Sequence, residues 1–367
     1  MKRRHTTALC ALTATAALAA AAPAAPVAQA APPRTVSAWL PYWDQEAAYR
    51  DALAHSAQIR TISPFWYQTK SATRVAGHTG AGERRIIDGL HARGIQVVPT
   101  VMEQMKPGAL GSVLTSDKAR ARHVDALLAV ARSRDYDGLD IDYESIAPSP
   151  DDKYRAVRDG YADFATELCA RLHAVDKQCF VTVMPKTRGT GRVWDYERLG
   201  RVADRVRIMG YNLHNAQGKP GPLASPAWYD EILTRATAQV PRAKLEMGIP
   251  AYGWNWKLGK ADKVAEGADD GRDGSSSKRA QHVTSKSAEA LRRKVGARYA
   301  LDPESRTPHF TYTEGKGKKA VRRTVWYQDA AGTAAHLPVL RKHGVRNTVL
   351  WALNFEDPKL WKTLARG

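Results

Sequence analysis

The chain has 367 residues, of which 43% are hydrophobic, and this length suits one large α/β barrel of roughly 250 residues with an insertion. Its formal net charge is +19, but the basic residues are spread along the chain, which argues against a nucleic-acid partner. A basic exported protein suits a polyanionic setting such as a cell wall. We expect a monomer that contacts an anionic cell wall and binds no nucleic acid.

The first 30 residues have the pattern of a signal peptide. A basic start at residues 2–4 precedes an Ala-rich segment at 6–22, and Ala28-Gln29-Ala30 places small residues where a signal peptidase cleaves. The alternative is a membrane anchor, which two prolines and the weakly apolar alanines disfavour. We expect residues 1–30 to be removed, residues 31–34 to form a linker, and the protein to be secreted to the extracellular space or cell wall.

Short β-type runs alternate with helical stretches over residues 35–367. This alternation predicts βα units around a parallel sheet, and eight units predict a closed (β/α)8 TIM barrel. A doubly wound open sheet is the alternative, although no Gly-rich phosphate loop follows the first run. The eight candidate strands are Thr35–Tyr42, Ile59–Tyr67, Ile95–Met102, Tyr136–Glu144, Cys179–Pro185, Arg205–Tyr211, Lys244–Pro250 and Arg346–Leu353.

The connection between the seventh and eighth candidate strands is much longer than the others. It contains a Gly/Ser-rich loop at 267–278, a helical run at Ser287–Gly296, and strand-like pieces around His309–Tyr312 and Val321–Tyr327. We therefore expect a small α+β insertion on the barrel rim, at residues 257–330.

The fourth candidate strand carries acidic residues at every second position. Alternate side chains of a strand point to opposite faces, so Asp140, Asp142 and Glu144 share one face. In a barrel this face points inward and steps toward the carboxyl end of the strand, where barrel active sites lie. Like charges this close raise at least one pKa, and a carboxyl that stays protonated near neutral pH can act as a general acid. We predict a catalytic cluster with Glu144 outermost.

Two other interpretations of the acidic face compete with catalysis. Asp-x-Asp is half of a metal site, but no His or further acidic residue stands at ligand spacing nearby, so we expect no metal. The carboxylates would otherwise simply be solvated, which their alternation with Leu139 and Ile141 in a central strand disfavours.

Cys169 and Cys179 lie between an expected helix and an expected strand. Cys10 falls in the expected signal peptide, so the exported chain has an even pair, which favours a disulfide. The alternative is two free buried thiols. A bridge across so short a loop is worth about 2–3 kcal/mol of chain entropy.

The acidic strand belongs to a longer set of motifs. Residues 137–144 read D-x-x-D-x-D-x-E, the signature of glycoside hydrolase family 18, the chitinases and their relatives. Residues 63–67 resemble the second strand of the branch that contains spore-germination and cortex-fragment-lytic N-acetylglucosaminidases. The resemblance covers essentially the whole expected mature chain. Its further motifs are Met209–Asn212 in the sixth strand, Gly248–Gly253 in the seventh, Val325–Asp329 at the end of the insertion, and Leu350–Leu353 in the eighth.

This resemblance implies a retaining glycosidase without an enzyme nucleophile, in which the N-acetyl carbonyl of the substrate attacks the anomeric carbon. Glu144 would be the acid/base. Asp142 would orient the acetamido group, and Asp140 would share protons with Asp142. Tyr211 would hydrogen-bond the acetamido oxygen, and Trp351 would form an apolar floor under the sugar.

The resemblance also implies further substrate-binding residues: Asp137, Met209, Asn212, Trp66 and Tyr252. Asp137 is expected to support its strand from the N-terminal side. Asn212 stands where many relatives have Asp, and residues 99–102 lack the Ser/Gly-rich pattern of typical chitinases, in agreement with the germination-type branch. Two roles stay open for seven aromatic residues near strand ends, namely stacking on a sugar ring or packing at the barrel rim. They are Trp39, Tyr42, Trp43, Trp66, Tyr67, Trp254 and Trp256.

We therefore expect a secreted hydrolase of β-1,4-linked N-acetylglucosamine polymers that uses no cofactor. Peptidoglycan fragments and chitin both fit, and cleavage of N-linked glycans stays open, as does the choice between endo and exo action. The alternative function is a chitinase-like lectin that binds N-acetylated glycans without cleaving them. The presence of Glu144 disfavours the lectin.

Overall fold

The computed structural model describes residues 36–106, 108–146, 154–259 and 280–366. The expected signal peptide, the linker and the Gly/Ser-rich loop at 267–278 lie outside these residues. In the part of the chain that the structure describes, no helix combines the length and the apolar character needed to cross a membrane.

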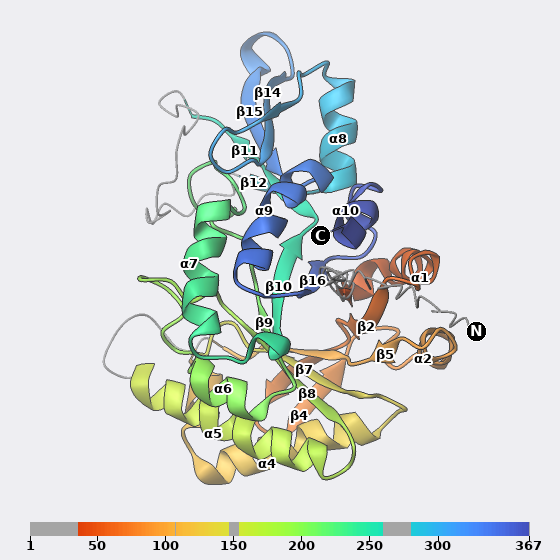
Figure 1. The fold of residues 1–367 in the computed structure, drawn as a ribbon, viewed down its shortest axis with the longest axis vertical. Coiled ribbons are helices and arrows are strands. Elements are labelled where there is room, and N and C mark those ends of the chain that lie inside the picture. The colour runs from red at the N-terminus through yellow and green to blue at the C-terminus, as the bar shows by residue number, and fades with distance from the viewer. Residues whose placement is uncertain (1–35, 107, 147–153, 260–279, 367) are drawn as a thin grey trace, which may run out of the picture. The chain divides into compact units, whose positions relative to one another are not determined.

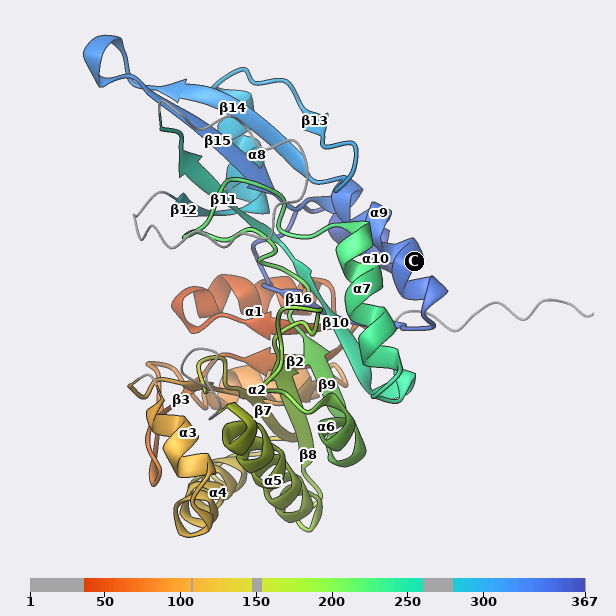
Figure 2. The same ribbon diagram turned by 90° about the vertical axis from the view of Figure 1, so that its left-hand side faces the viewer.

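Eight strand segments form a curled parallel sheet, so the predicted (β/α)8 barrel is confirmed (Figures 1 and 2). β1 pairs with β16 on one side and with β2 on the other. The third segment closes the ring, because β5 pairs with β2 while β6 pairs with β7. The barrel strands are β1 (Val36–Leu40), β2 (Ile59–Pro64), β5 (Gln96–Val97) with β6 (Thr100–Glu103), β7 (Gly138–Asp142), β8 (Gln178–Val183), β9 (Arg205–Ile208), β10 (Leu245–Pro250) and β16 (Asn347–Trp351).

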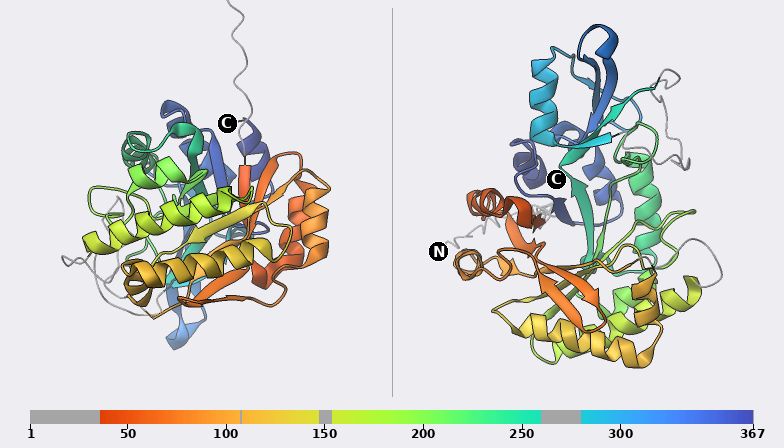
Figure 3. Two further views of the ribbon diagram at one scale, coloured as in Figure 1. Left: turned by 90° about the horizontal axis from the view of Figure 1, so that it is seen from below. Right: turned by 180° about the vertical axis from the view of Figure 1, so that it is seen from behind.

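Helices lie on the outside of this sheet, as Figure 3 shows from below. Several begin at a side chain that satisfies a free backbone N–H, for example Ser116 before α4 and Ser225 before α7. The helices around the barrel are α1 (Gln45–Ala54), α2 (Arg84–His91), α3 (Ala109–Leu114), α4 (Asp117–Arg132), α5 (Tyr154–His173), α6 (Tyr196–Val202), α7 (Pro226–Thr237), α9 (Ala330–Lys342) and α10 (Leu360–Arg366). Short 3-10 turns lie at Tyr42–Asp44, Arg242–Lys244 and Gly317–Lys319.

The two faces of β7 are chemically distinct, as the alternation predicts. Leu139, Ile141 and Tyr143 are fully buried in the core that also contains the outer helices. The Tyr143 hydroxyl lies 2.8 Å from Nε2 of His123 on α4. The acidic residues of β7 therefore face the barrel interior.

A second sheet lies between β10 and β16, where the sequence predicts an α+β insertion. Its five strands have the order β12-β11-β15-β14-β13, and α8 (Ser285–Lys294) packs against it. The sheet begins at Tyr252, because β11 continues almost directly from β10. Its strands are β11 (Tyr252–Lys257), β12 (Ala280–Thr284), β13 (Ala300–Leu301), β14 (Pro308–Glu314) and β15 (Val321–Tyr327).

One hairpin was not predicted. β3 (Tyr67–Ser71) and β4 (Arg74–Gly77) form an antiparallel pair, and β3 extends the barrel sheet by pairing with β6. The run that was expected to be one long second strand therefore divides after Pro64.

The predicted disulfide between Cys169 and Cys179 is present. It connects α5 to β8, and both cysteines are buried. The bridge therefore joins a helix to the strand that follows the acidic strand in the barrel.

Replacing both cysteines with alanine is expected to lower the free energy of unfolding by about 2–3 kcal/mol, because the unfolded chain loses a covalent loop. Urea denaturation of the variant and the wild type measures the difference. Repeating both titrations with a reducing agent is the control, since the difference should then largely disappear. Equal stability under oxidising conditions would show that the bridge contributes little.

Candidate active site

The barrel interior contains a buried ionic network. The Asp140 carboxylate accepts hydrogen bonds from four donors, which are Trp39 Nε1 at 2.9 Å, Thr100 Oγ1 at 2.8 Å, Thr182 Oγ1 at 2.8 Å and Arg207 Nη1 at 3.0 Å. A carboxylate offers about four acceptor sites, so these donors fix its orientation.

Arg207 is fully buried at the centre of this network. Its Nε donates to Glu246 Oε2 at 2.8 Å, and its Nη1 donates to Ser63 Oγ at 2.5 Å. Arg205 Nε lies 3.4 Å from the other oxygen of Glu246. Two guanidinium groups therefore pair with two carboxylates, Asp140 and Glu246, and no ion pair among the described residues reaches the third acid of this cluster.

Asp142 is that third acid, and it is buried at the outer end of β7. Burial, followed by the nearby charges of Glu144 and Asp140, raises the pKa of Asp142 well above its ordinary value, although Arg207 acts in the opposite direction. Asp142 therefore keeps its proton to a higher pH than an exposed aspartate. Its Oδ1 is buried and has no hydrogen-bond partner among the described residues.

Glu144 follows β7 and is exposed to solvent. The protein packed around its carboxyl, and then the charge of Glu103, raise the pKa of Glu144. Glu103 lies close to Glu144 because the β6–β7 register aligns Met102, the residue before Glu103, with Asp142. Its Oε2 accepts the backbone N–H of Ser145 at 2.7 Å, and burial raises its own pKa as well.

Glu103 is an acidic neighbour of Glu144 that the sequence analysis did not select. It directly follows the third candidate strand, where an acidic residue resembles any solvated loop residue. In the described part of the chain, no group of three or more His, Cys, Asp or Glu side chains is placed to hold a metal.

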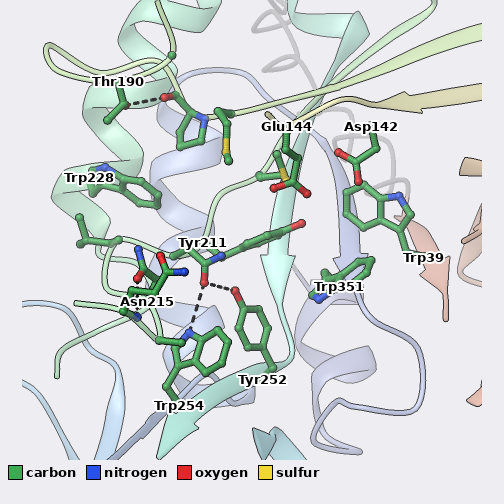
Figure 4. Close-up of a pocket in the computed structure, with 18 of the residues that line it drawn as sticks. Trp39, Asp142, Glu144, Thr190, Tyr211, Asn215, Trp228, Tyr252, Trp254 and Trp351 are labelled. Atoms are coloured by element: carbon green, nitrogen blue, oxygen red, sulfur yellow. Dashed lines mark hydrogen bonds between the residues drawn. The ribbon is translucent and has the colours of Figure 1, made fainter. Parts of the chain in front are cut away.

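The carboxyls open into a cleft of about 1590 Å³, larger than the roughly 300–1,000 Å³ of ordinary small-molecule sites. In Figure 4, Glu144 lies between Trp351 on one side and Thr190 and Trp228 on the other, and Tyr211 lies below it. A cleft of this size on both sides of one carboxyl fits a chain of several sugar rings.

Trp351 presents a half-buried indole to this cleft. It is held edge-to-face by Trp39 and Phe65, with ring centroids 5.7 Å and 5.0 Å away. Tyr211 and Met209 line the cleft close by. Burial raises the pKa of Tyr211 well above its ordinary value, so its hydroxyl remains an O–H donor.

Asn212 has a positive φ of 66°, a conformation that asparagine tolerates better than most residues. Its Oδ1 accepts the Tyr252 hydroxyl at 2.5 Å and the Trp254 indole N–H at 3.4 Å. An indole N–H can only donate, so the amide oxygen must face Trp254. β11, which carries Tyr252 and Trp254, therefore lines the cleft together with Asn212.

The cleft brings most of the predicted site residues together. Those that line it are Asp142, Glu144, Met209, Tyr211, Asn212, Tyr252 and Trp351. Asp140 lies beneath them in the barrel interior. Trp39, Tyr42, Trp43 and Trp254 also line the cleft, and so does Trp228 of α7, which the sequence analysis did not select.

Asp137 and Trp66 do not reach the cleft, because other contacts hold them elsewhere. Asp137 accepts the Val97 N–H at 2.7 Å and lies 2.9 Å from His91 Nε2, so it supports the N-terminal end of β7. Trp66 is fully buried in the core, and its indole N–H donates to Gln45. Tyr67 and Trp256 are likewise packing residues.

The buried carboxyls of β7 and the acid that follows them occur in the order of the D-x-x-D-x-D-x-E signature, and Trp351 of β16 lies beside them in the cleft. The model of glycosyl hydrolases family 18 matches residues 40–356. The chain belongs to this family. It is a glycoside hydrolase with a chitinase-like barrel.

Relatives of this family 18 hydrolase include proteins of two Bacillus species. The chain is 28% identical over 266 residues to the uncharacterized glycosylase YvbX of Bacillus subtilis, covering 71% of this chain and 70% of that protein. It is 24% identical over 322 residues to the cortical fragment-lytic enzyme of Bacillus anthracis, covering 84% and 69% respectively. A chitinase structure from Chromobacterium violaceum has the same fold, with a TM-score of 0.74, 24% identity, and coverage of 90% of this chain and 98% of that one.

Glu103→Gln is expected to shift the descending, alkaline limb of the kcat/KM–pH profile to lower pH. The acid must be protonated, so the rate falls as pH rises through the pKa of Glu144. Removing the Glu103 charge lowers that pKa, while the glutamine oxygen can still accept the Ser145 N–H. A pH–rate series measures the shift. The exposed Glu304→Gln is the control, and an unmoved limb in E103Q would contradict the coupling.

Proposed function

We propose that this hydrolase is a secreted, retaining glycosidase that cleaves β-1,4-linked N-acetylglucosamine polymers by substrate-assisted catalysis. Peptidoglycan fragments and chitin are the candidate polymers. The observation that carries the proposal is the pair formed by Asp142, buried with an unpartnered oxygen, and Glu144, exposed beside it.

The reacting sugar would lie on the Trp351 indole, since an aromatic face packs well on a pyranose ring. Its acetamido group would then point to the polar groups at the outer end of the barrel interior. Tyr211 donates to the acetamido oxygen, and the free Oδ1 of Asp142 accepts from the acetamido N–H. This placement satisfies the one buried oxygen of Asp142 that has no partner in the described protein.

In the first step the acetamido oxygen forms a bond to the anomeric carbon as the glycosidic C–O bond breaks. The leaving oxygen takes the proton of Glu144, and positive charge develops on the oxazolinium ring. Asp142 lies against the acetamido nitrogen and stabilises that charge. Burial of its carboxyl raises the pKa of Glu144, so this group keeps its proton to a higher pH than a fully solvated glutamate does.

In the second step water attacks the anomeric carbon on the face that the leaving group left. Glu144, now a carboxylate, takes one proton from this water, and the bond to the acetamido oxygen breaks. Two inversions give net retention. The acid is regenerated, and all proton transfers pass through one carboxyl.

The substrate class rests on the relatives and on charge. One relative is named a cortical fragment-lytic enzyme, and this name supports peptidoglycan fragments as the polymer. The net charge of +19 favours an anionic wall as the surroundings. Export would follow from the expected signal peptide.

Glu144→Gln is expected to abolish cleavage while preserving binding, because the amide keeps the shape of the side chain but has no proton to transfer. Chitin oligosaccharides and peptidoglycan fragments are incubated with each protein, and products are identified by mass spectrometry. Calorimetry measures binding by the variant. Cleavage at the wild-type rate in E144Q would refute the mechanism, and binding without cleavage by the wild type would indicate a lectin.

Asp142→Asn is expected to lower kcat by about 100- to 1000-fold, because electrostatic stabilisation at such sites is typically worth about 3–4 kcal/mol. The exposed turn residue Asp176 has a φ of 56° that asparagine tolerates, so Asp176→Asn is a matched control. Steady-state kinetics on one oligosaccharide compares the three proteins. Near-normal turnover in D142N would exclude acetamido assistance through this residue.

A further inference from the structure

The cleft has two chemically different halves on either side of Glu144. The half that contains Trp351 is aromatic, with Trp43 and Phe65 near it. The opposite half is formed by the loop after β8, at residues 184–192, and by α7. Figure 4 shows this division, with Thr190 and Trp228 across Glu144 from Trp351. The two halves are suited to different ligand groups.

The loop after β8 is held in one shape by its own hydrogen bonds. The Thr187 hydroxyl accepts the N–H groups of residues 189 and 190, each at 3.2 Å, and the Thr190 hydroxyl donates to Pro185 O at 2.8 Å. Glu231 of α7 accepts the Arg188 N–H at 2.8 Å and anchors the loop to that helix. The loop is therefore a built wall of the cleft.

Two guanidinium groups of this loop, those of Arg188 and Arg192, line the cleft and are exposed. Neither forms an ion pair within the described ranges of the chain. Glu231, an acid that lines this wall, accepts the Arg188 backbone N–H and lies 3.6 Å from Arg235. This half of the cleft thus presents two cations that the protein itself does not neutralise.

The proposed mechanism decides which part of the substrate meets these cations. The sugar that supplies the anomeric carbon lies on Trp351, and Glu144 protonates the oxygen that leaves. The leaving sugar must therefore continue past Glu144, away from Trp351. That direction leads to the wall that carries Arg188 and Arg192.

We propose that Arg188 and Arg192 bind a carboxylate carried by the leaving sugar, so that the preferred substrate has a muramic acid residue there. Chitin has no carboxylate, whereas muramic acid carries one on its lactyl ether or, where substituted, on the stem peptide. Guanidinium groups pair with carboxylates in bidentate geometry. This inference rests on the proposed function and selects peptidoglycan within it. It also fixes the bond that is cut, because N-acetylglucosamine must then supply the anomeric carbon.

The test compares one glycan in two charge states. A peptide-free tetrasaccharide of alternating N-acetylglucosamine and muramic acid is used with free lactyl carboxylates and as its methyl ester. The wild type should prefer the free acid by about tenfold in kcat/KM, as two charge-assisted contacts allow. In R188Q/R192Q the preference should fall toward unity, whereas Arg132→Gln, an exposed arginine on α4, should retain it.

The source of the carboxylate is identified by a third substrate, the same glycan with stem peptides. If only this glycan shows a rate that depends on the two arginines, the carboxylate belongs to the peptide, and the proposal stands with that source. Screening by salt should weaken whichever preference is found. Calorimetry with the Glu144→Gln protein gives the same comparison for binding alone.

Several outcomes would overturn the inference. One is an unchanged preference in R188Q/R192Q, and another is an equal loss of rate on the acid and the ester. New reducing ends on muramic acid, seen by mass spectrometry, would place the acidic sugar on Trp351 and also overturn it. Failure of the wild type to cleave these glycans or chitin oligosaccharides would instead refute the proposed function itself.

Discussion

The chemistry of this barrel depends on the ion network around Arg207. This buried guanidinium and its neighbour Arg205 pair with Asp140 and Glu246, whereas Asp142 has no ion pair among the described residues. Breaking a buried pair by removing one partner typically costs about 3–5 kcal/mol, so the network is not free to rearrange. Asp142, whose pKa is raised by burial, therefore stands next to Asp140, whose orientation is fixed by its hydrogen-bond donors. Electrostatic preorganisation of this kind serves catalysis because nothing must reorient when charge develops.

Much of this architecture could be predicted because it is periodic. The acidic residues of β7 repeat at every second position, which fixes their common face in any strand, and the eight strands alternate with helices. The role of Glu103 could not be predicted, since its approach to Glu144 depends on the register between β6 and β7. The burial of Trp66 and Trp256 could not be predicted from the sequence either. Whether an indole near a strand end is packed or exposed depends on the elements that cover it, and those come from distant parts of the chain.

The second sheet is part of the site as well as an addition to the barrel. β11 leaves β10 almost directly and carries Tyr252 and Trp254 to the amide of Asn212. The left-handed backbone at Asn212 aims that amide at them. One wall of the cleft is thus formed jointly by a barrel loop and the inserted sheet. The wall across Glu144 from Trp351, at residues 184–192, is formed by a barrel loop and α7.

Trp39 takes part both in the buried ion network and in the support of the Trp351 ring. Its indole N–H donates to Asp140 at 2.9 Å, and its ring supports the edge of Trp351 at 5.7 Å. Phenylalanine could keep the ring contact but not the donor, and a small polar residue could keep the donor but not the ring. Trp43 also contacts Trp351, but it is 53% exposed, and its indole N–H has no hydrogen bond to a buried carboxylate among the described residues. Substitution should therefore be rarer at position 39 than at position 43, although both tryptophans contact the same Trp351 ring.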